Sequence, residues 1–189
     1  MIPLGILAAA GGAVAAADSY DLLATEILTS SSSSITFASL GTYAPDYQHL
    51  QLRMVGRTNR ASTSDYINVQ LNGDTGSNYA HHSLYGNGSS VVAGTALTSD
   101  SKMGFNRFSG ASASSNIFGS IVLDLLDAFE TTKYKTLRSL GGTAAVSINL
   151  NSGLWMDTDA LTSIKIEPGS GSSLITGSRF SLYGIRKAA

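Results

Sequence analysis

The sequence contains no cysteine among its 189 residues, and it has few charged side chains. The absence of cysteine excludes thiolate catalysis, disulfide bonds and every metal site built on cysteine ligands. Twelve Lys and Arg residues face 13 Asp and Glu residues, which leaves a formal net charge of −1. A chain without an excess of clustered Lys and Arg lacks the electrostatic footprint of a nucleic-acid-binding protein.

Small and hydroxyl-bearing residues take the place of the missing charges. The chain contains 29 Ser, 16 Thr and 20 Gly, whereas charged residues make up 13% of it, against a globular average of about 25%. A surface solvated by hydroxyl groups and backbone amides is more typical of an all-β shell or adhesion protein than of a cytosolic enzyme. Composition alone does not identify chemistry, so function has to be argued from particular segments.

The first segment, MIPLGILAAAGGAVAAA at residues 1–17, is apolar and has no charged side chain before Asp18. A signal peptide is disfavoured because no Lys or Arg precedes the apolar run, and because Pro3 and three glycines interrupt it. The run is also too short and too rich in glycine for a membrane span, which needs about 20 apolar residues.

We therefore expect residues 1–19 to form an extended docking arm. Ordering about fifteen residues costs roughly what the burial of their apolar surface gains, so the arm should order where a partner supplies a groove and backbone hydrogen bonds. The alternative is an apolar strand that folds back onto its own domain. The residues expected to dock are Ile2, Pro3, Leu4, Ile6, Leu7 and Val14.

After Tyr20 the sequence alternates with a period of two residues, which indicates β-strands. In HLQLRMV, residues 49–55, apolar side chains alternate with polar ones, and in VSINLNSGLW the residues Val146, Ile148 and Leu150 share one face. The predicted strands cover residues 21–28, 34–40, 49–55, 66–73, 79–85, 102–108, 116–126, 134–140, 146–155, 163–169 and 179–186.

Turn signals such as Asn72-Gly73 and Asn87-Gly88 separate these strands. One stretch, LDLLDAFETTKYKTL, could hold a helical turn around residues 123–132. Many short strands with a turn every 8–15 residues or so predict an all-β, two-sheet β-sandwich of the jelly-roll-like kind. The predicted domain organisation is the arm at residues 1–19 and the sandwich at residues 20–189.

The segment LNGDTGSNYAHHSLYGNGSS, residues 71–90, resembles an active site in its density of Asp, His, Tyr and Ser. His81 and His82 are adjacent, so on a strand they point to opposite faces and cannot bind one metal ion together. We interpret the segment as a polar turn between strands, with no metal. The residues expected to make surface contacts are Tyr79, His81, His82, Tyr85 and Trp155.

The other polar motifs predict no catalytic site and no cofactor. Asp74 is the one carboxylate in NGDTGSN, whereas a calcium loop supplies several, and residues 157–159 fit a solvated turn equally well. No Gly-x-Ser-x-Gly elbow occurs, and the carboxylates near residues 124–130 are explained as strand-end positions rather than a glycosidase pair. GSGSS at residues 169–173 is followed by neither Lys nor a helical pattern, so it is a loop and not a phosphate cradle.

Carbohydrate binding stays open as an alternative. Trp155 and tyrosines such as Tyr79 and Tyr85 could stack on sugar rings, beside polar partners such as Asn78 and Arg107. The competing interpretation is that aromatic side chains on sandwich strands pack in the core or at its rim.

Six segments follow one another along nearly the whole chain: MIPLGILAA, YQHLQLRMVGRTNRA, LNGDTGSNYAHHSLYGNGSS, FGSIVLDLLDAFETTKYKTLRSL, SGLW and PGSGSSLITGSRFSLYGIR. Together and in this order they resemble small virion structural proteins of tailed bacteriophages. The resemblance implies a component of the phage particle and not an enzyme, and it supplies no catalytic residues. It also implies that NGDTGSNY is a turn in which Gly73 and Gly76 provide backbone freedom.

The expected function is thus a non-enzymatic virion protein, most simply a capsid decoration or cement protein anchored by its N-terminal arm. The alternative is a tail or tail-fibre module that contacts host surface glycans. The expected partners are the major capsid or tail proteins and further copies of the chain, as a homotrimer, with neither nucleic acid nor membrane. The expected location is the virion, after synthesis in the host cytoplasm.

Overall fold

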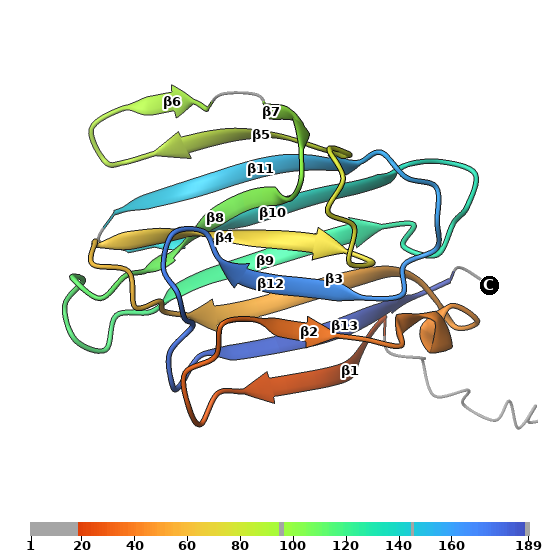
Figure 1. Cartoon of the computed structure of the whole chain (residues 1–189), viewed down its shortest axis with the longest axis horizontal. Coiled ribbons are helices and arrows are strands. Elements are labelled where there is room, and N and C mark those ends of the chain that lie inside the picture. Colours follow the sequence, from red (N-terminus) through yellow and green to blue (C-terminus); the bar gives the residue numbers. More distant parts are fainter. Residues whose placement is uncertain (1–18, 95–96, 145, 188–189) are drawn as a thin grey trace, which may run out of the picture.

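The computed structural model describes residues 19–94, 97–144 and 146–187, and within them the chain is a sandwich of two antiparallel sheets (Figure 1). The larger sheet runs in the order β1 (Tyr20–Ile27), β13 (Arg179–Arg186), β3 (Tyr47–Gly56), β9 (Gly119–Leu126), β10 (Lys135–Thr143), β11 (Ser147–Trp155), β5 (Tyr79–Gly86) and β6 (Val91–Ala93), with β7 (Leu97–Asp100) also paired to β5. The smaller sheet runs in the order β2 (Ile35–Phe37), β12 (Ile164–Pro168), β4 (Ser64–Leu71) and β8 (Met103–Ser109). The predicted all-β sandwich is confirmed.

The two sheets do not cover one another completely. In Figure 1 the smaller sheet overlies the middle of the larger one, whereas β5, β6 and β7 extend past it along one edge. Strands distant in sequence are neighbours in the larger sheet, because β13 lies between β1 and β3, and β9 follows β3. This arrangement leaves β11, β5, β6 and β7 at a partly open end of the sandwich.

Each predicted strand is present, with ends displaced by at most three residues. The predicted strand at 34–40 is shortened to β2, because Ser39 takes a φ of 58° and the 3-10 turn η1 (Leu40–Tyr43) follows it. No helix forms around residues 123–132: β9 continues to Leu126, and Asp127 then takes a φ of 48°, which ends the strand in a turn. The short strands β6 and β7 were missed, because three or four residues carry too little alternation to be recognised.

The apolar core lies where β13, β3 and β9 face the smaller sheet. Leu50, Leu52 and Met54 of β3 point inward and are buried, as their alternation predicts. From the opposite sheet, Ile67 and Val69 of β4 are completely buried. Burial of these side chains is the main stabilising contribution, at about 1.5–3 kcal/mol for each large aliphatic residue.

At β11 the inner face of the larger sheet carries polar side chains and its outer face carries apolar ones. On β9, adjacent to the core, Leu123 points inward and Val122 outward. On β11 the polar Asn149 and Asn151 are 5% and 7% exposed, whereas the apolar Ile148 and Leu150 are 63% and 55% exposed. A shift of one residue in register would exchange the two sets, so this orientation is fixed by the pairing of β11 with β10 and β5.

Residues 1–18 of the predicted arm lie outside the described residues, so the arm stays a prediction. Among the residues that the structure describes, no helix is long and apolar enough to cross a membrane.

Candidate functional site

The segment at residues 71–90 begins with a tight turn after β4. Asn72 and Gly73 both have positive φ, 53° and 68°, so the turn requires residues that tolerate the left-handed region. The Oδ1 atom of Asn72 also accepts a hydrogen bond from Thr162 N at 2.7 Å, which ties the turn to the chain before β12. Gly73 has the conformation that was predicted, whereas Gly76 is not among the glycines with positive φ.

Asp74 is the centre of a hydrogen-bond cluster in this turn. Its Oδ2 atom accepts hydrogen bonds from Trp155 Nε1 at 2.7 Å and Asn78 Nδ2 at 2.9 Å, and Oδ1 accepts one from Gly76 N at 2.7 Å. The hydrogen bond from Trp155 is the main reason that the pKa of Asp74 lies below its ordinary value. A carboxylate held by three donors is used as an acceptor that organises the turn.

Tyr79 and Trp155 are not surface contact residues, which corrects the sequence-based prediction. They are 0% and 1% exposed, and their rings stack with centroids 6.4 Å apart. The Tyr79 hydroxyl accepts a hydrogen bond from Leu71 N at 3.0 Å, and burial raises its pKa to about 12. Both rings close the end of the core, because their polar atoms find partners in the turn at Asp74.

His81, His82 and Tyr85 lie on β5 beyond this buried pair. His82 is exposed on the outer face of the sheet, whereas His81 and Tyr85 point to the inner face and line a cleft between the sheets. The structure therefore separates the five predicted contact residues into one outer residue, two cleft residues and two core residues. The prediction that the two histidines face opposite sides of the strand is confirmed.

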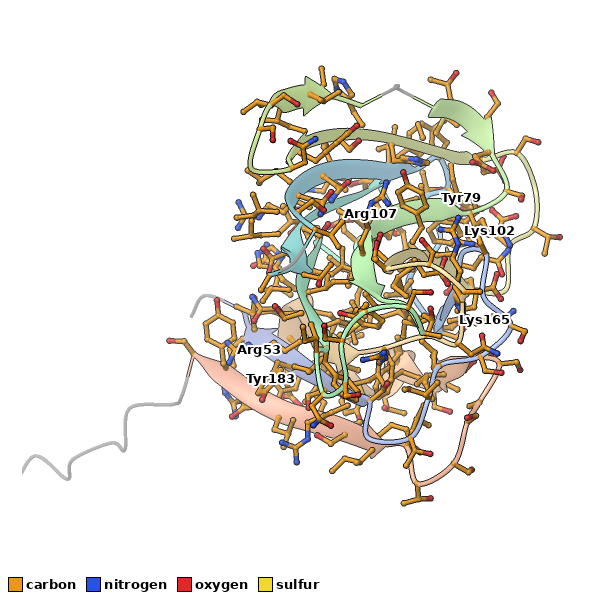
Figure 2. All side chains as sticks on the ribbon, turned by 90° about the vertical axis from the view of Figure 1, so that its left-hand side faces the viewer. Arg53, Tyr79, Lys102, Arg107, Lys165 and Tyr183 are labelled. Carbon is orange, nitrogen blue, oxygen red and sulfur yellow. The ribbon has the colours of Figure 1, made fainter. Side chains whose placement is uncertain are left out.

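The cleft has a volume of about 530 Å³ and lies at the open end of the sandwich, bounded by β5 and β11 on one side and by β4 and β8 on the other. Figure 2 labels Arg107, which lies on β8, and Lys102, which directly precedes this strand. The lining is mixed: apolar Val92 and Ala93 are accompanied by polar side chains. The polar lining consists of Tyr66, Asn68, His81, Ser83, Tyr85, Asp100, Lys102, Arg107, Asn149 and Asn151.

The cationic side chains of the cleft have partners. Lys102 Nζ forms an ion pair with Glu167 Oε1 at 2.9 Å. Arg107 lies over the Tyr66 ring, 4.1 Å from its centroid, and donates hydrogen bonds to Ser64 Oγ at 3.1 Å and to the Tyr66 hydroxyl. The cleft is therefore lined by fixed polar groups, whose positions are set by contacts within the protein.

Neutral amides form the floor of the cleft on β11. Asn149 Nδ2 donates to Ser147 Oγ at 3.0 Å, and Asn151 Nδ2 donates to Ser139 Oγ at 3.3 Å. Because the amide nitrogens donate in both bonds, the Oδ1 atoms remain as acceptors. These hydrogen bonds offset the cost of burying the two amides and hold their side chains in place.

The pKa of His81 lies below its ordinary value because burial opposes the charged form more than the nearby Asp100 favours it. The unfolded chain, whose His titrates near 6.5, therefore binds the proton at a higher pH than the folded protein does. Stability is full above this value and decreases as the pH falls through it. We expect the free energy of unfolding of the His81→Gln variant to decrease less than that of the wild type between pH 7.5 and about 5.5.

Urea denaturation at a series of pH values measures this difference. The matched control is His82→Gln, which makes the same substitution at an exposed position of the same strand. Identical pH profiles for the wild type and the His81→Gln variant would contradict a lowered pKa at the half-buried His81.

The outer face of the larger sheet carries an exposed apolar row. Val122, Leu140, Leu150 and Leu84 are direct cross-strand neighbours on β9, β10, β11 and β5, and each is at least 40% exposed. Ile148 lies next to this row on β11. We call these five residues the apolar face.

A polar row borders the apolar face. Asp124, Arg138, Ser152 and His82 occupy the next cross-strand positions, and Arg138 Nε contacts Asp124 Oδ2 at 2.9 Å. A contiguous apolar area of several hundred Å² with a polar rim is typical of a protein–protein contact.

The remaining polar motifs are structural. The GSGSS loop is held by the completely buried Asp65, whose carboxylate accepts hydrogen bonds from Ser170 N at 3.0 Å and Gly171 N at 2.8 Å. No group of three His, Asp or Glu side chains converges on a common point within residues 19–94, 97–144 and 146–187.

The cleft as a whole was not predicted, although Tyr85, His81 and Arg107 were singled out separately. The signal that could have revealed it is in β11, where Asn149 and Asn151 alternate with Ile148 and Leu150. The alternation was recognised, but the apolar set could not be assigned to the outer face without knowing that β8 and β5 place a polar cleft on the other side.

No protein-family model matches the chain, and the comparison with curated proteins finds no relative. The function must therefore be argued from the sequence and from the geometry of these two surfaces.

Proposed function

We propose that the chain is a non-enzymatic structural protein of a tailed-bacteriophage virion, with capsid decoration as its role. It would be made in the host cytoplasm and act in the assembled particle. The observation that carries the proposal is the apolar face, because four cross-strand neighbours expose large aliphatic side chains on one face of the sheet. The resemblance of the six sequence segments to virion proteins points in the same direction.

The exposed apolar face favours assembly over catalysis. An exposed row of Leu, Ile and Val side chains is unfavourable in water, and covering it with another protein gains roughly 25 cal/mol for each Å² of apolar surface removed from solvent. A sheet face can pack against a second sheet at a separation of about 10 Å. The proposed partners are the shell protein and neighbouring copies of this chain, in a trimer.

The predicted arm is the second part of the proposal. Residues 2–17 would dock in a groove of a neighbouring protein in the particle, which their apolar, uncharged sequence favours. Deletion of these residues should leave a soluble folded domain that no longer joins the particle.

The experiment that tests the proposal is quantitative mass spectrometry of purified virions, with the copy number measured against the major shell protein. Hundreds of copies would support capsid decoration. Three, six or twelve copies would support a tail position, and absence from the particle would overturn the proposal.

Polar substitution of the apolar face should prevent assembly without unfolding the domain. We expect the Leu140→Lys, Leu150→Lys double variant to lose incorporation at least about tenfold, equal to about 1.4 kcal/mol of binding free energy, while exposed positions of this kind change stability by about 0.5 kcal/mol each. Incorporation is measured by in vivo complementation and mass spectrometry of the particles.

The control for this variant is Tyr134→Lys, which places the same charge on an exposed aromatic side chain in the turn before β10, away from the apolar face. Normal incorporation of the double variant would show that the apolar face is not the assembly surface.

A second candidate function is a tail or tail-fibre module that contacts host glycans. The polar cleft favours it, since the cleft is a concave site of a size typical for small ligands. Two of the aromatic side chains that first suggested glycan binding, Tyr79 and Trp155, do not support it, because both are buried.

A further inference from the structure

We propose that the cleft between β5, β11, β4 and β8 binds an uncharged saccharide through the inward-facing polar side chains of β11 and β5. The inference deepens the second candidate function and rests on neither the capsid-decoration role nor the virion position.

The inner face of β11 is polar where the cleft lies. The orientation of β11 is set by its pairing and by Trp155, which lies on the same face as Asn149 and Asn151 and is 1% exposed. Asn149 and Asn151 therefore occupy inward positions at which aliphatic side chains would contribute more to stability. Polar residues at such positions are expected where they have a binding role.

The groups of the cleft that are available to a ligand are neutral. Lys102 is paired with Glu167, and Arg107 is held by Ser64 and Tyr66, so neither cation is a free anion receptor. The neutral donors and acceptors are the amides of Asn68, Asn149 and Asn151 and the hydroxyls of Ser83 and Tyr85. Closely spaced neutral amides and hydroxyls match the alternating donors and acceptors of adjacent sugar hydroxyl groups.

The shape of the cleft suits a sugar ring. A volume of about 530 Å³ lies within the range of small-ligand sites. Tyr85 is the direct cross-strand neighbour of Asn149 on β11 and of Val92 on β6, so an aromatic ring and an amide lie side by side in the lining. A sugar ring has an apolar C–H face and a polar hydroxyl edge, so it can stack on the Tyr85 ring while its hydroxyl groups reach the amide.

Gly104 provides a way to fill the cleft. A Cβ atom at Gly104 would lie 3.5 Å from Asn68 Oδ1 and 3.8 Å from His81 Nε2, both at ordinary van der Waals distance. Larger side chains at this position would therefore occupy the space between the two polar residues. Gly104→Val fills the cleft, and Asn149→Ala removes one amide from its floor.

The test is saturation-transfer difference NMR on the full chain with glucose, galactose, mannose and N-acetylglucosamine, each at about 10 mM. We expect transfer to at least one of these sugars and a reduction of its affinity of about fivefold or more in Asn149→Ala, as the loss of a hydrogen bond predicts. Gly104→Val should abolish the transfer. The matched control is Leu150→Ala, the next residue on the same strand but on the outer face, which should bind like the wild type.

Three outcomes would overturn the inference: no transfer to any of the four sugars, equal transfer in the wild type and Asn149→Ala, or transfer to the acidic sugar N-acetylneuraminate alone. Thermal unfolding shows whether each variant is folded. If Gly104→Val does not fold, the sugar affinity of Asn149→Ala tests the inference by itself. Copy number in the virion is measured separately, so a particle protein without sugar binding would overturn this inference and leave the proposed function intact.

Discussion

Replacing Trp155 with Ala is expected to lower the free energy of unfolding by about 4 kcal/mol, as for other buried Trp and Phe residues. The side chain is 1% exposed and stacks on the buried Tyr79 ring, so its removal leaves a cavity at the end of the core. It also removes the donor at 2.7 Å from Asp74 Oδ2, and the turn at Asp74 loses the link to β11. Chemical denaturation in urea, with the slope of the transition compared between variants, measures the loss.

Two further variants separate the loss of the hydrogen bond to Asp74 from the loss of ring packing. Trp155→Phe keeps most of the ring and removes the hydrogen bond to Asp74, so it should cost about 1.5–3 kcal/mol, the range for a bond to a charged group. Tyr134→Ala removes an aromatic side chain that is half exposed, and should change stability by less than about 1 kcal/mol. A loss below 1 kcal/mol for Trp155→Ala would restore its interpretation as a surface contact residue.

Replacing Arg57 with Ala is expected to cost between about 3 and 5 kcal/mol and to release the segment at residues 111–117. Arg57 is buried directly after β3, and its guanidinium donates four hydrogen bonds to backbone carbonyl oxygens of this segment. The acceptors are Ser114 O at 2.8 Å, Ile117 O at 3.2 Å, Ala111 O at 3.1 Å and Ala113 O at 2.7 Å. One side chain thus supplies partners for four carbonyl groups of a long loop.

Hydrogen exchange of the loop amides distinguishes this role from a general loss of stability. In Arg57→Ala the amides of residues 110–112, which donate to the backbone at Thr63, Arg60 and Ser62, should exchange faster than the core strands do. The control is Arg53→Ala on β3, the strand that ends directly before Arg57. Figure 2 shows Arg53 beside Tyr183, where it lies 4.5 Å from the ring centroid, and it is exposed, so this variant should cost about 1 kcal/mol or less. Equal exchange in the two variants would contradict the proposed role of Arg57.

The fold class followed from local information because the alternation on β3 and β4 reports both the strand and its buried face. Leu50, Leu52 and Met54 alternate with polar residues, and the structure buries the apolar set. The same reasoning gave the wrong environment for Trp155 and Tyr79. The motif at residues 71–90 placed Tyr79 beside His and Asn residues, and nothing local showed that Trp155 meets this motif. The hydrogen bond from Trp155 Nε1 to Asp74 joins residues 81 positions apart.

The candidate surfaces were recognised only in parts, because each combines distant strands. The apolar face needs the pairing of β9, β10, β11 and β5, and the cleft needs β8 and β4 opposite β11. Strand β11 reads as an ordinary amphipathic strand in isolation. Which of its faces meets water depends on what the rest of the chain places against each side.

The sequence by itself determined the described strands other than β6 and β7, the tight turn at Asn72 and Gly73 and the two-sheet architecture, because side-chain alternation and backbone preference act over a few residues. It also excluded cysteine chemistry by composition. The tertiary structure decided that Asp74 organises a turn, that Arg57 holds a loop, and that the polarity of the sheet reverses at β11. These depend on contacts between residues distant in the chain, and such contacts form only when the two sheets pack.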